Sequence, residues 1–466
     1  MISLHYNTGN PYRLYGINHF SQKYGIPLSF DTKSDKLCKD IKKINIQIIE
    51  NEIQKDISGY LKTNTEKIPL FEKPKRFDEN GENLVKFVDS EGDEYPCIIS
   101  KGNMITISFD IFNEIGHILA GHLERFWTLN NPESKQLMKI PVVDCYEKIL
   151  FDCIKFVGKK LNIQFEHEPF WPNNKKFAVC LTHDVDRIKK TFQYVTHTIR
   201  NLKKGKISLA LSQLSSLMRR ENPYWNFDKI IEMERREGVK STFFFLNEQK
   251  KFFCLPGEWK LYWGRYDIKD RRIVEVIKKL DAEGWEVGVH GSYNSYQNLE
   301  MMRGEKETLE EILGKRVRGI SQHYCNLEIP STWEYHEKLG FLYDASLGFV
   351  TDIGFRWGTC HPFHPFNPEN GRILSLWELP ITIMDNACAY KSWQDIMEII
   401  NTVERYNGLL LLRWHQAVFN EREFPGRSEI YKRIIKECVK RGAWITNAYN
   451  IANWLTERER YINTHA

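Results

Sequence analysis

The chain has 466 residues, of which 42% are hydrophobic and 27% charged, and its 66 basic and 61 acidic side chains give a formal net charge of +5. This composition is ordinary for soluble globular proteins and excludes a disordered, collagenous or membrane-spanning chain. The mild positive charge gives no indication of nucleic-acid binding. At about 150 residues per domain, the length predicts two or three domains.

The amino terminus and the cysteines bear on the cellular compartment. The first residues, Met1–Asn7, lack a positive segment followed by an apolar stretch, so they show no secretion signal. The 10 cysteines are scattered, without a CxxC pair or a regular framework. No apolar run approaches the roughly 18 residues of a transmembrane helix. We therefore expect a cytoplasmic protein whose thiols are free and mostly buried.

A polar segment with two prolines, Glu168–Lys176, interrupts regular structure and marks the clearest domain boundary. Upstream of it, Leu84–Val88 has the composition of a strand, and the apolar residues of Val143–Val157 recur with helical spacing. We predict a small accessory α+β domain over residues 1–170 and a second domain over residues 171–466.

In the second half of the chain, apolar runs of strand length alternate with amphipathic stretches, for example Asp270–Glu283 and Trp393–Tyr406. The predicted strands are Phe177–Thr182, Ser241–Leu246, Trp285–His290, Arg318–Tyr324, Phe341–Ser346, Leu376–Thr382, Gly408–His415 and Ala443–Asn447. About eight βα units in roughly 290 residues are typical of a (β/α) barrel, in which chemistry gathers at the carboxyl ends of the strands.

Acidic and imidazole side chains stand at several of these predicted strand ends. Asp184 and Asp186 follow the first strand, where residues two apart share a face, and His290, His323 and His415 follow later strands. Carboxylate and imidazole groups together suit a divalent ion such as zinc. Such an ion polarises a carbonyl, while a nearby carboxylate serves as base and a histidine as acid. Each residue alone is more often an ordinary hydrogen-bonding group, but the set on one rim favours a site.

Four short motifs carry a family resemblance. They are Asp184-Val185-Asp186, His290-Gly291-Ser292, Gln322-His323-Tyr324 and Leu411-Leu412-Arg413-Trp414-His415. In this order, over roughly residues 177–454, they resemble the motifs of polysaccharide deacetylases, the NodB-type enzymes of carbohydrate esterase family 4. The upstream half resembles the accessory domain of one bacterial branch. The resemblance implies an α/β fold, a distorted (β/α) barrel of the NodB type preceded by a smaller α+β domain.

The resemblance also implies roles for individual residues. Asp184 corresponds to the catalytic base, and Asp186 and His290 correspond to ligands of a divalent metal, for which zinc is expected. His415 corresponds to the acid that protonates the leaving group.

Two positions depart from the family pattern. Asn294 stands where the family has the second metal-binding histidine, and an amide oxygen is a poorer zinc ligand than imidazole. We take Asn294 as the third ligand position, with His323 as the first alternative. Ser321 stands where the family has an arginine that orients the base, and Arg318 or Arg356 are candidates to compensate.

Other residues are candidates for substrate contacts. Tyr324, Trp357 and Trp414 lie at or after predicted strand ends, where aromatic faces can stack on a sugar ring, and ordinary packing is the alternative. Arg356 can hold a carboxylate or phosphate of the substrate. The basic and leucine-rich segment Asn201–Arg220 is interpreted as a solvated excursion, with a membrane-surface helix or a lid over an anionic substrate as alternatives.

These observations lead to a functional hypothesis. The expected protein is a metal-dependent carbohydrate deacetylase, a hydrolase of amide bonds that removes N- or O-acetyl groups from a glycan or glycan precursor. One alternative is a catalytically impaired carbohydrate-binding protein on the same fold, and another is a cyclic amide hydrolase. The expected partner is an acetylated carbohydrate and not a nucleic acid, and the sequence leaves the oligomeric state open.

Overall fold

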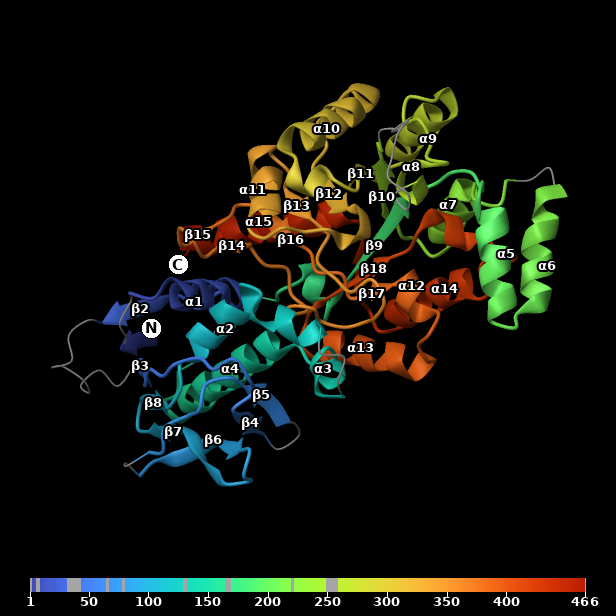
Figure 1. Ribbon diagram of the computed structural model, residues 1–466. Coiled ribbons are helices and arrows are strands. Elements are labelled where there is room, and N and C mark those ends of the chain that lie inside the picture. Colours follow the sequence, from blue (N-terminus) through green and yellow to red (C-terminus); the bar gives the residue numbers. More distant parts are fainter. Residues whose placement is uncertain are drawn as a thin grey trace. The chain divides into compact units, whose positions relative to one another are not determined.

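A computed structural model describes residues 2–5, 9–31, 43–63, 67–77, 80–128, 132–163, 169–218, 222–248 and 259–465 (Figure 1). The chain divides into two compact units. The first consists of Met1–Asn174, Phe355–Ile373 and Thr456–Ala466, and the second of Lys175–Gly354 and Leu374–Leu455. The predicted boundary segment lies at the first division, although its first residue, Glu168, is outside the described residues. The grouping of residues 355–373 and 456–466 with the first unit differs from the predicted domain limits.

The first unit contains one mixed β-sheet in the order β2-β1-β3-β8-β7-β6-β4-β5. Strands β2, β1, β3 and β8 are parallel, and β8, β7, β6, β4 and β5 are antiparallel. Its elements are β1 (Ile2–His5), α1 (Pro11–Tyr24), β2 (Leu28–Asp31), β3 (Ile44–Ile48), β4 (Gly59–Lys62), β5 (Lys67–Leu70), β6 (Glu82–Asp89), β7 (Glu94–Lys101), β8 (Met104–Ile107), α2 (Ile111–Leu119), α3 (Pro132–Leu137), α4 (Val142–Lys160), β14 (Phe366–Asn367) and β15 (Arg372–Ile373).

The second unit alternates strands with helices. Its elements are β9 (Ala178–Val185), α5 (Gln193–Lys203), α6 (Ile207–Ser215), α7 (Phe227–Arg236), β10 (Thr242–Leu246), α8 (Trp259–Tyr262), α9 (Arg271–Ala282), β11 (Glu286–Gly291), α10 (Leu299–Leu313), β12 (Gly319–Gln322), α11 (Ser331–Lys338), β13 (Tyr343–Asp344), β16 (Trp377–Glu378), β17 (Ile383–Met384), α12 (Asp385–Cys388), α13 (Trp393–Arg405), β18 (Leu409–Arg413), α14 (Arg427–Lys440) and β19 (Trp444–Thr446). Helix α15 (Ala448–His465) begins in this unit.

The sheet of the second unit is parallel throughout, in the order β16-β13-β12-β11-β10-β9-β18-β17, and β19 also pairs with β9. Among the described residues, no strand pairing joins β16 to β17, so the barrel is not closed by a regular ladder. This arrangement confirms the predicted α/β class and the distortion of the barrel. Every predicted strand has an observed counterpart, and the sequence analysis missed only the short β17 among the strands of this sheet.

Local sequence explains why these elements form. Strand β18 consists of four consecutive leucines followed by Arg413, and all of its residues are buried, as expected for a parallel strand covered on both faces. Helix α9 begins at Asp270, whose side chain accepts a hydrogen bond from the Arg272 N–H. Helix α13 begins with a capping box between Ser392 and Asp395. None of the described helices is long and apolar enough to cross a membrane.

Candidate metal-binding and catalytic site

The alternation of strand β9 places its two aspartates on one face. His183 points to the opposite face, where its ring nitrogens contact the Trp414 carbonyl at 2.9 Å and the Glu234 carboxylate at 2.8 Å. Asp184 and Asp186 lie on the other side of the strand, and both line the same cavity. The predicted convergence of the two carboxylates is therefore present in the structure.

Asp186, His290 and His323 form a cluster in which one ligand atom from each residue lies within 4.8 Å of the others. His290 Nε2 is 3.1 Å from Asp186 Oδ1, and His323 Nε2 is 3.4 Å from Asp186 Oδ2. The imidazoles come from the ends of β11 and β12, neighbouring strands that pair His290 with Ser321. One carboxylate and two imidazoles are a donor set that suits zinc.

The hydrogen bonding of these groups also fits a divalent cation. His290 Nδ1 donates to the Ser321 carbonyl at 2.7 Å, so Nε2 is the ring nitrogen that faces Asp186. Burial lowers the pKa of His323 to about 4, against the opposing charge of Asp186, so its ring is neutral at pH 7. His290 Nε2 and Asp186 Oδ1 are buried and face each other at 3.1 Å, and neither atom has another hydrogen-bond partner among the described residues. Buried polar atoms without partners are costly, and a bound ion removes that cost.

A buried arginine adjoins the cluster, and the sequence analysis did not anticipate it. Arg265 Nη2 lies 3.3 Å from His323 Nε2, and its Nη1 lies 3.9 Å from Asp186 Oδ2. Nη1 also donates to the Asp186 carbonyl at 2.9 Å. The guanidinium thus neutralises part of the carboxylate charge and competes with a cation for the His323 lone pair. No strand pattern marked Arg265 in the sequence.

Asp184 has a different environment from Asp186. Its Oδ2 lies 3.3 Å from Arg413 Nε and 3.7 Å from His290 Nε2, while its Oδ1 is buried without a hydrogen-bond partner among the described residues. Arg413 Nη2 donates to the Ser321 hydroxyl and to the Ala345 carbonyl, so the guanidinium is held rigidly. A carboxylate fixed in this way, with one oxygen left over, is suited to accept a proton.

Arg413 is the arginine that lies beside Asp184 in the structure. It is fully buried at the end of β18, and its Nη2 also donates to the hydroxyl of Ser321, the position where the sequence analysis expected an arginine. The two arginines suggested from sequence have other environments: Arg318 is exposed, and Arg356 pairs with Glu124. A signal was available, because strand alternation places Arg413 on the same side as His415 and opposite Trp414.

His415 is oriented by a carboxylate from a neighbouring strand end. Asp385, the first residue of α12, accepts hydrogen bonds from the His415 backbone N–H at 2.7 Å and from Nδ1 at 2.9 Å. Burial lowers the pKa of His415, but Asp385 and the more distant Asp186 and Asp184 outweigh burial and raise this pKa to about 10. The ring is therefore protonated at neutral pH, with Nε2 3.9 Å from Asp186 Oδ2. It is placed to donate a proton at the cavity, and sequence reasoning missed Asp385.

Asn294 lies just beyond β11, in the loop before α10. Its side-chain amide nitrogen donates to the Tyr262 hydroxyl at 3.1 Å. None of the hydrogen bonds described for this residue reaches Asp186, His290 or His323. The imidazole of His323 completes the close cluster instead, which agrees with the alternative considered from sequence, and the role of Asn294 as a ligand stays a prediction.

The side chain of Tyr324 is exposed, as a residue that contacts a substrate must be. Its side chain is 54% exposed, and its ring centroid lies 5.7 Å from that of Tyr293 and 4.5 Å from that of His323. Its backbone has a φ of 60°, and that of the following Cys325 has a φ of 57°. Two consecutive non-glycine residues in the left-handed region are uncommon, and such strain is concentrated at functional sites.

The other aromatic candidates do not present a ring face to a ligand. Trp414 is fully buried, packs against Tyr431, and donates from Nε1 to the Arg427 carbonyl at 3.2 Å. Trp357 is also buried, and its Nε1 donates to Glu124. Arg356 forms a two-pronged ion pair with the same Glu124, at 2.8 and 2.9 Å. Contacts within the first unit thus hold Trp357 and Arg356, and Trp414 packs in the core of the second unit. Substrate contacts by these three residues stay predictions.

A substitution of Trp414 distinguishes packing from sugar stacking. We expect Trp414→Phe to lower the free energy of unfolding by about 1–3 kcal/mol, because the hydrogen bond to the partly buried Arg427 carbonyl is lost and the smaller ring leaves a gap. Urea unfolding followed by circular dichroism measures this change. Unchanged stability together with a raised KM for an acetylated oligosaccharide would instead support the stacking role.

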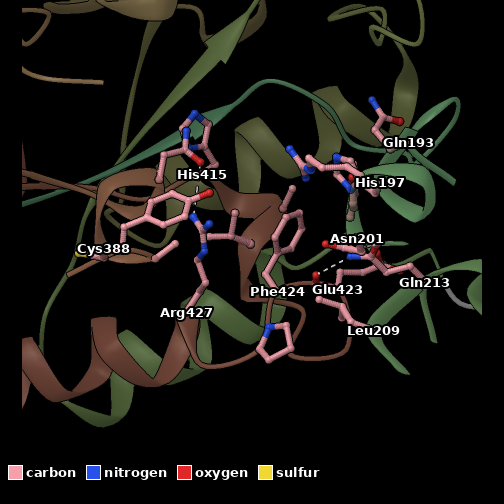
Figure 2. Close-up of a pocket in the computed structure, with 18 of the residues that line it drawn as sticks. Gln193, His197, Asn201, Leu209, Gln213, Cys388, His415, Glu423, Phe424 and Arg427 are labelled. Atoms are coloured by element: carbon pink, nitrogen blue, oxygen red, sulfur yellow. Dashed lines mark hydrogen bonds between the residues drawn. The ribbon is translucent and has the colours of Figure 1, made fainter. Parts of the chain in front are cut away.

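The catalytic candidates open on a cavity of about 740 Å³. Figure 2 shows His415 and Arg427 on one side of this cavity and His197, Asn201 and Gln213 on the other, with Phe424 between them. This volume lies within the roughly 300–1,000 Å³ common for small-ligand sites. The cavity therefore has room for a sugar beside the catalytic side chains.

Known proteins share this fold at low sequence identity. No protein-family model and no curated protein sequence matches the chain. Several similar solved structures are described as polysaccharide deacetylases. One from Mycobacterium smegmatis is 19% identical over 62% of this chain and 93% of its own, with a TM-score of 0.41. Another from Pseudomonas aeruginosa is 16% identical over 64% and 96%, with a TM-score of 0.40.

A further similar structure is an allantoinase, Puue, which is 16% identical over 62% of this chain and 94% of its own, with a TM-score of 0.40. At these values the comparisons describe a general likeness of fold and assign no activity. The function of this chain is therefore argued from its own site.

Proposed function

We propose that this protein is a metal-dependent hydrolase that removes N- or O-acetyl groups from a carbohydrate. The observation that carries the proposal is the meeting of three different groups at one cavity. These groups are the Asp186, His290 and His323 cluster, the arginine-held carboxylate of Asp184, and the protonated His415. A ligand cluster, a base and an acid are the components that hydrolysis of an acyl bond requires.

Each side chain has a defined part in this reaction. A divalent ion held by Asp186, His290 and His323 supplies a Lewis acid for the acetyl group. Asp184 removes a proton from the attacking water, and Arg413 and Ser321 fix the base in position. His415 donates its Nε2 proton to the nitrogen or oxygen that leaves the carbonyl carbon. The products are acetate and the free amine or hydroxyl of the sugar.

Release of acetate tests this proposal directly. We expect the purified protein to release acetate from at least one member of a panel of N- and O-acetylated oligosaccharides and sugar precursors. Treatment with a chelator should lower the rate at least tenfold, and zinc, cobalt or manganese should restore it. Heat-treated protein and chelator alone are the controls.

Three outcomes contradict the proposal. If the protein binds the sugars and a stoichiometric metal but releases no acetate, it is a carbohydrate-binding protein on this fold. If it opens small cyclic amides and leaves every acetylated sugar intact, it is a cyclic amide hydrolase. Acetate release that persists unchanged after complete removal of metal would exclude the metal-dependent mechanism.

A further inference from the structure

The cavity beside the catalytic residues continues onto a helical hairpin formed by α5 and α6, which pack against one another (Figure 1). Its wall is rich in cationic side chains. The arginines and lysines that line it are Arg187, Arg200, Lys204, Lys206, Lys391 and Arg427. Clustered cationic side chains repel one another unless an anion offsets the repulsion. Such a wall therefore indicates an anionic ligand, because a neutral acetylated sugar would not offset this repulsion.

The carboxylates of the cavity leave part of this positive charge uncompensated. Glu423 is held by the buried Lys190, whose Nζ lies 2.8 Å from both carboxylate oxygens. Lys391 pairs with Asp352 at 2.6 Å, and Arg427 pairs with Asp385 at 3.5 Å.

Three cationic side chains of the hairpin are not neutralised by such an ion pair. In the part of the chain that the structure describes, Arg200, Lys204 and Lys206 have no carboxylate partner. Lys204 Nζ donates to the Tyr390 hydroxyl at 3.4 Å and lies 5.5 Å from the centroid of that ring. The uncompensated charge therefore lies at the hairpin end of the cavity, away from the acidic residues Asp184 and Asp186.

A buried polar network fixes this end of the cavity. Asn201 on α5 donates to the Gln213 side chain on α6 at 2.7 Å, and Gln213 donates to the Glu423 carbonyl at 2.9 Å (Figure 2). Lys190 joins the network through the Gln213 carbonyl at 3.0 Å. The neighbouring His197 lines the cavity, and its buried Nδ1 has no hydrogen-bond partner among the described residues. The network thus holds the hairpin in place, and His197 Nδ1 is available to bind a ligand.

We propose that the hairpin end of this cavity binds a phosphate or diphosphate group of the substrate, so that the acetyl group removed belongs to a phosphate-linked sugar. This inference rests on the proposed deacetylase function for the sugar, but the anion site can be tested without turnover. Arg200, Lys204 and Lys206 supply the charge, and His197 supplies a hydrogen-bonding atom. Guanidinium and ammonium groups are the usual protein partners of phosphate oxygens.

The outer surface of the hairpin bears on the source of the phosphate. Apolar side chains are exposed by 45–91% along it, namely Val195, Ile199, Leu202, Ile207, Leu211, Leu214, Leu217 and Met218. Exposed apolar side chains beside basic ones are typical of helices that lie at an anionic lipid surface. A lipid-linked diphosphate sugar is therefore favoured over a nucleotide-linked one. Arg219 and Arg220, which belong to the same basic segment in the sequence, lie outside the described residues.

Two triple variants test the anion site. The cavity variant is Arg200→Gln with Lys204→Gln and Lys206→Gln. The control variant is Lys278→Gln with Arg316→Gln and Lys440→Gln, which changes the net charge equally at exposed positions that do not line the cavity. We expect the dissociation constant for inorganic pyrophosphate, measured by calorimetry, to rise at least tenfold in the cavity variant and less than twofold in the control. Equal changes in both variants, or no change in either, would overturn the anion site.

The catalytic arm compares three acetylated sugars, one neutral, one linked to a nucleoside diphosphate, and one linked to a prenyl diphosphate in phosphatidylglycerol vesicles. We expect kcat/KM for a diphosphate-linked sugar to exceed that for the neutral sugar, and this preference to fall at least tenfold in the cavity variant only. Whichever diphosphate substrate is preferred identifies the source. Preference for the neutral sugar overturns the inference. If no sugar releases acetate, the proposed function fails, while pyrophosphate binding still decides the anion site.

Discussion

Asp186→Asn is expected to weaken zinc binding by more than tenfold, whereas Asp184→Asn is expected to retain zinc and lose turnover. Asp186 lies within 3.1 and 3.4 Å of two imidazole nitrogens, so the substitution removes the only anionic donor of the cluster. A loss of zinc affinity of more than tenfold corresponds to at least about 1.4 kcal/mol of binding free energy. Asp184 faces Arg413 instead, so its substitution removes a proton acceptor and should lower kcat about 10²- to 10⁴-fold.

Competition with a chromophoric zinc chelator measures the affinity of each variant, and acetate release measures kcat. Urea unfolding of both variants serves as the control, because both positions are close to buried charges. Equal zinc affinity in the two variants and the unmodified protein would refute the division of roles. So would an Asp184→Asn variant that keeps full turnover.

His323→Ala should lower zinc affinity at least tenfold, and Asn294→Ala should change it less than about threefold. The reason is geometric, because His323 Nε2 lies 3.4 Å from Asp186 Oδ2 while the Asn294 amide nitrogen donates to Tyr262. Burial keeps the His323 imidazole neutral, with a pKa of about 4, and the neutral ring is the form that binds metal. A neutral amide at position 294 contributes little to zinc binding in comparison.

The opposite pattern would restore the assignment made from sequence, in which position 294 provides the third ligand. Asn294→His separates the two hypotheses further. If position 294 is part of the ligand set, imidazole there should raise zinc affinity at least tenfold, or ~1.4 kcal/mol. If His323 already completes the set, the same change should leave affinity nearly unaltered. Both measurements use the same chelator competition, so the variants are directly comparable.

Strand periodicity was sufficient to predict much of the fold. The leucine run that forms β18 and the apolar stretch that forms β9 are buried on both faces, and such continuous runs are recognisable in a sequence. The assignment of segments 355–373 and 456–466 to the first unit was not predictable in this way. Contacts between segments distant in the chain decide that grouping, and local composition does not record them.

The sequence by itself determined which residues could share the rim of a barrel. The spacing of Asp184 and Asp186 and the strand ends at His290 and His415 required only the two-residue period of a strand and the parallel order of the sheet. Tertiary structure decided which partner each residue meets. Arg413 on β18 faces Asp184 on the neighbouring β9, and it also reaches Ser321 on β12, which is not adjacent to β18 in the sheet.

Tertiary structure also decided which candidates are available to a ligand. Trp414 is at the strand end that the sequence indicated, yet its ring is buried against Tyr431. Arg356 is in a loop rich in hydrogen-bond donors, yet Glu124, far away in the sequence, pairs with it. A strand pattern fixes the direction of a side chain relative to its own strand. Burial and charge pairing depend on the elements that pack around it, and these are set only when distant segments come together.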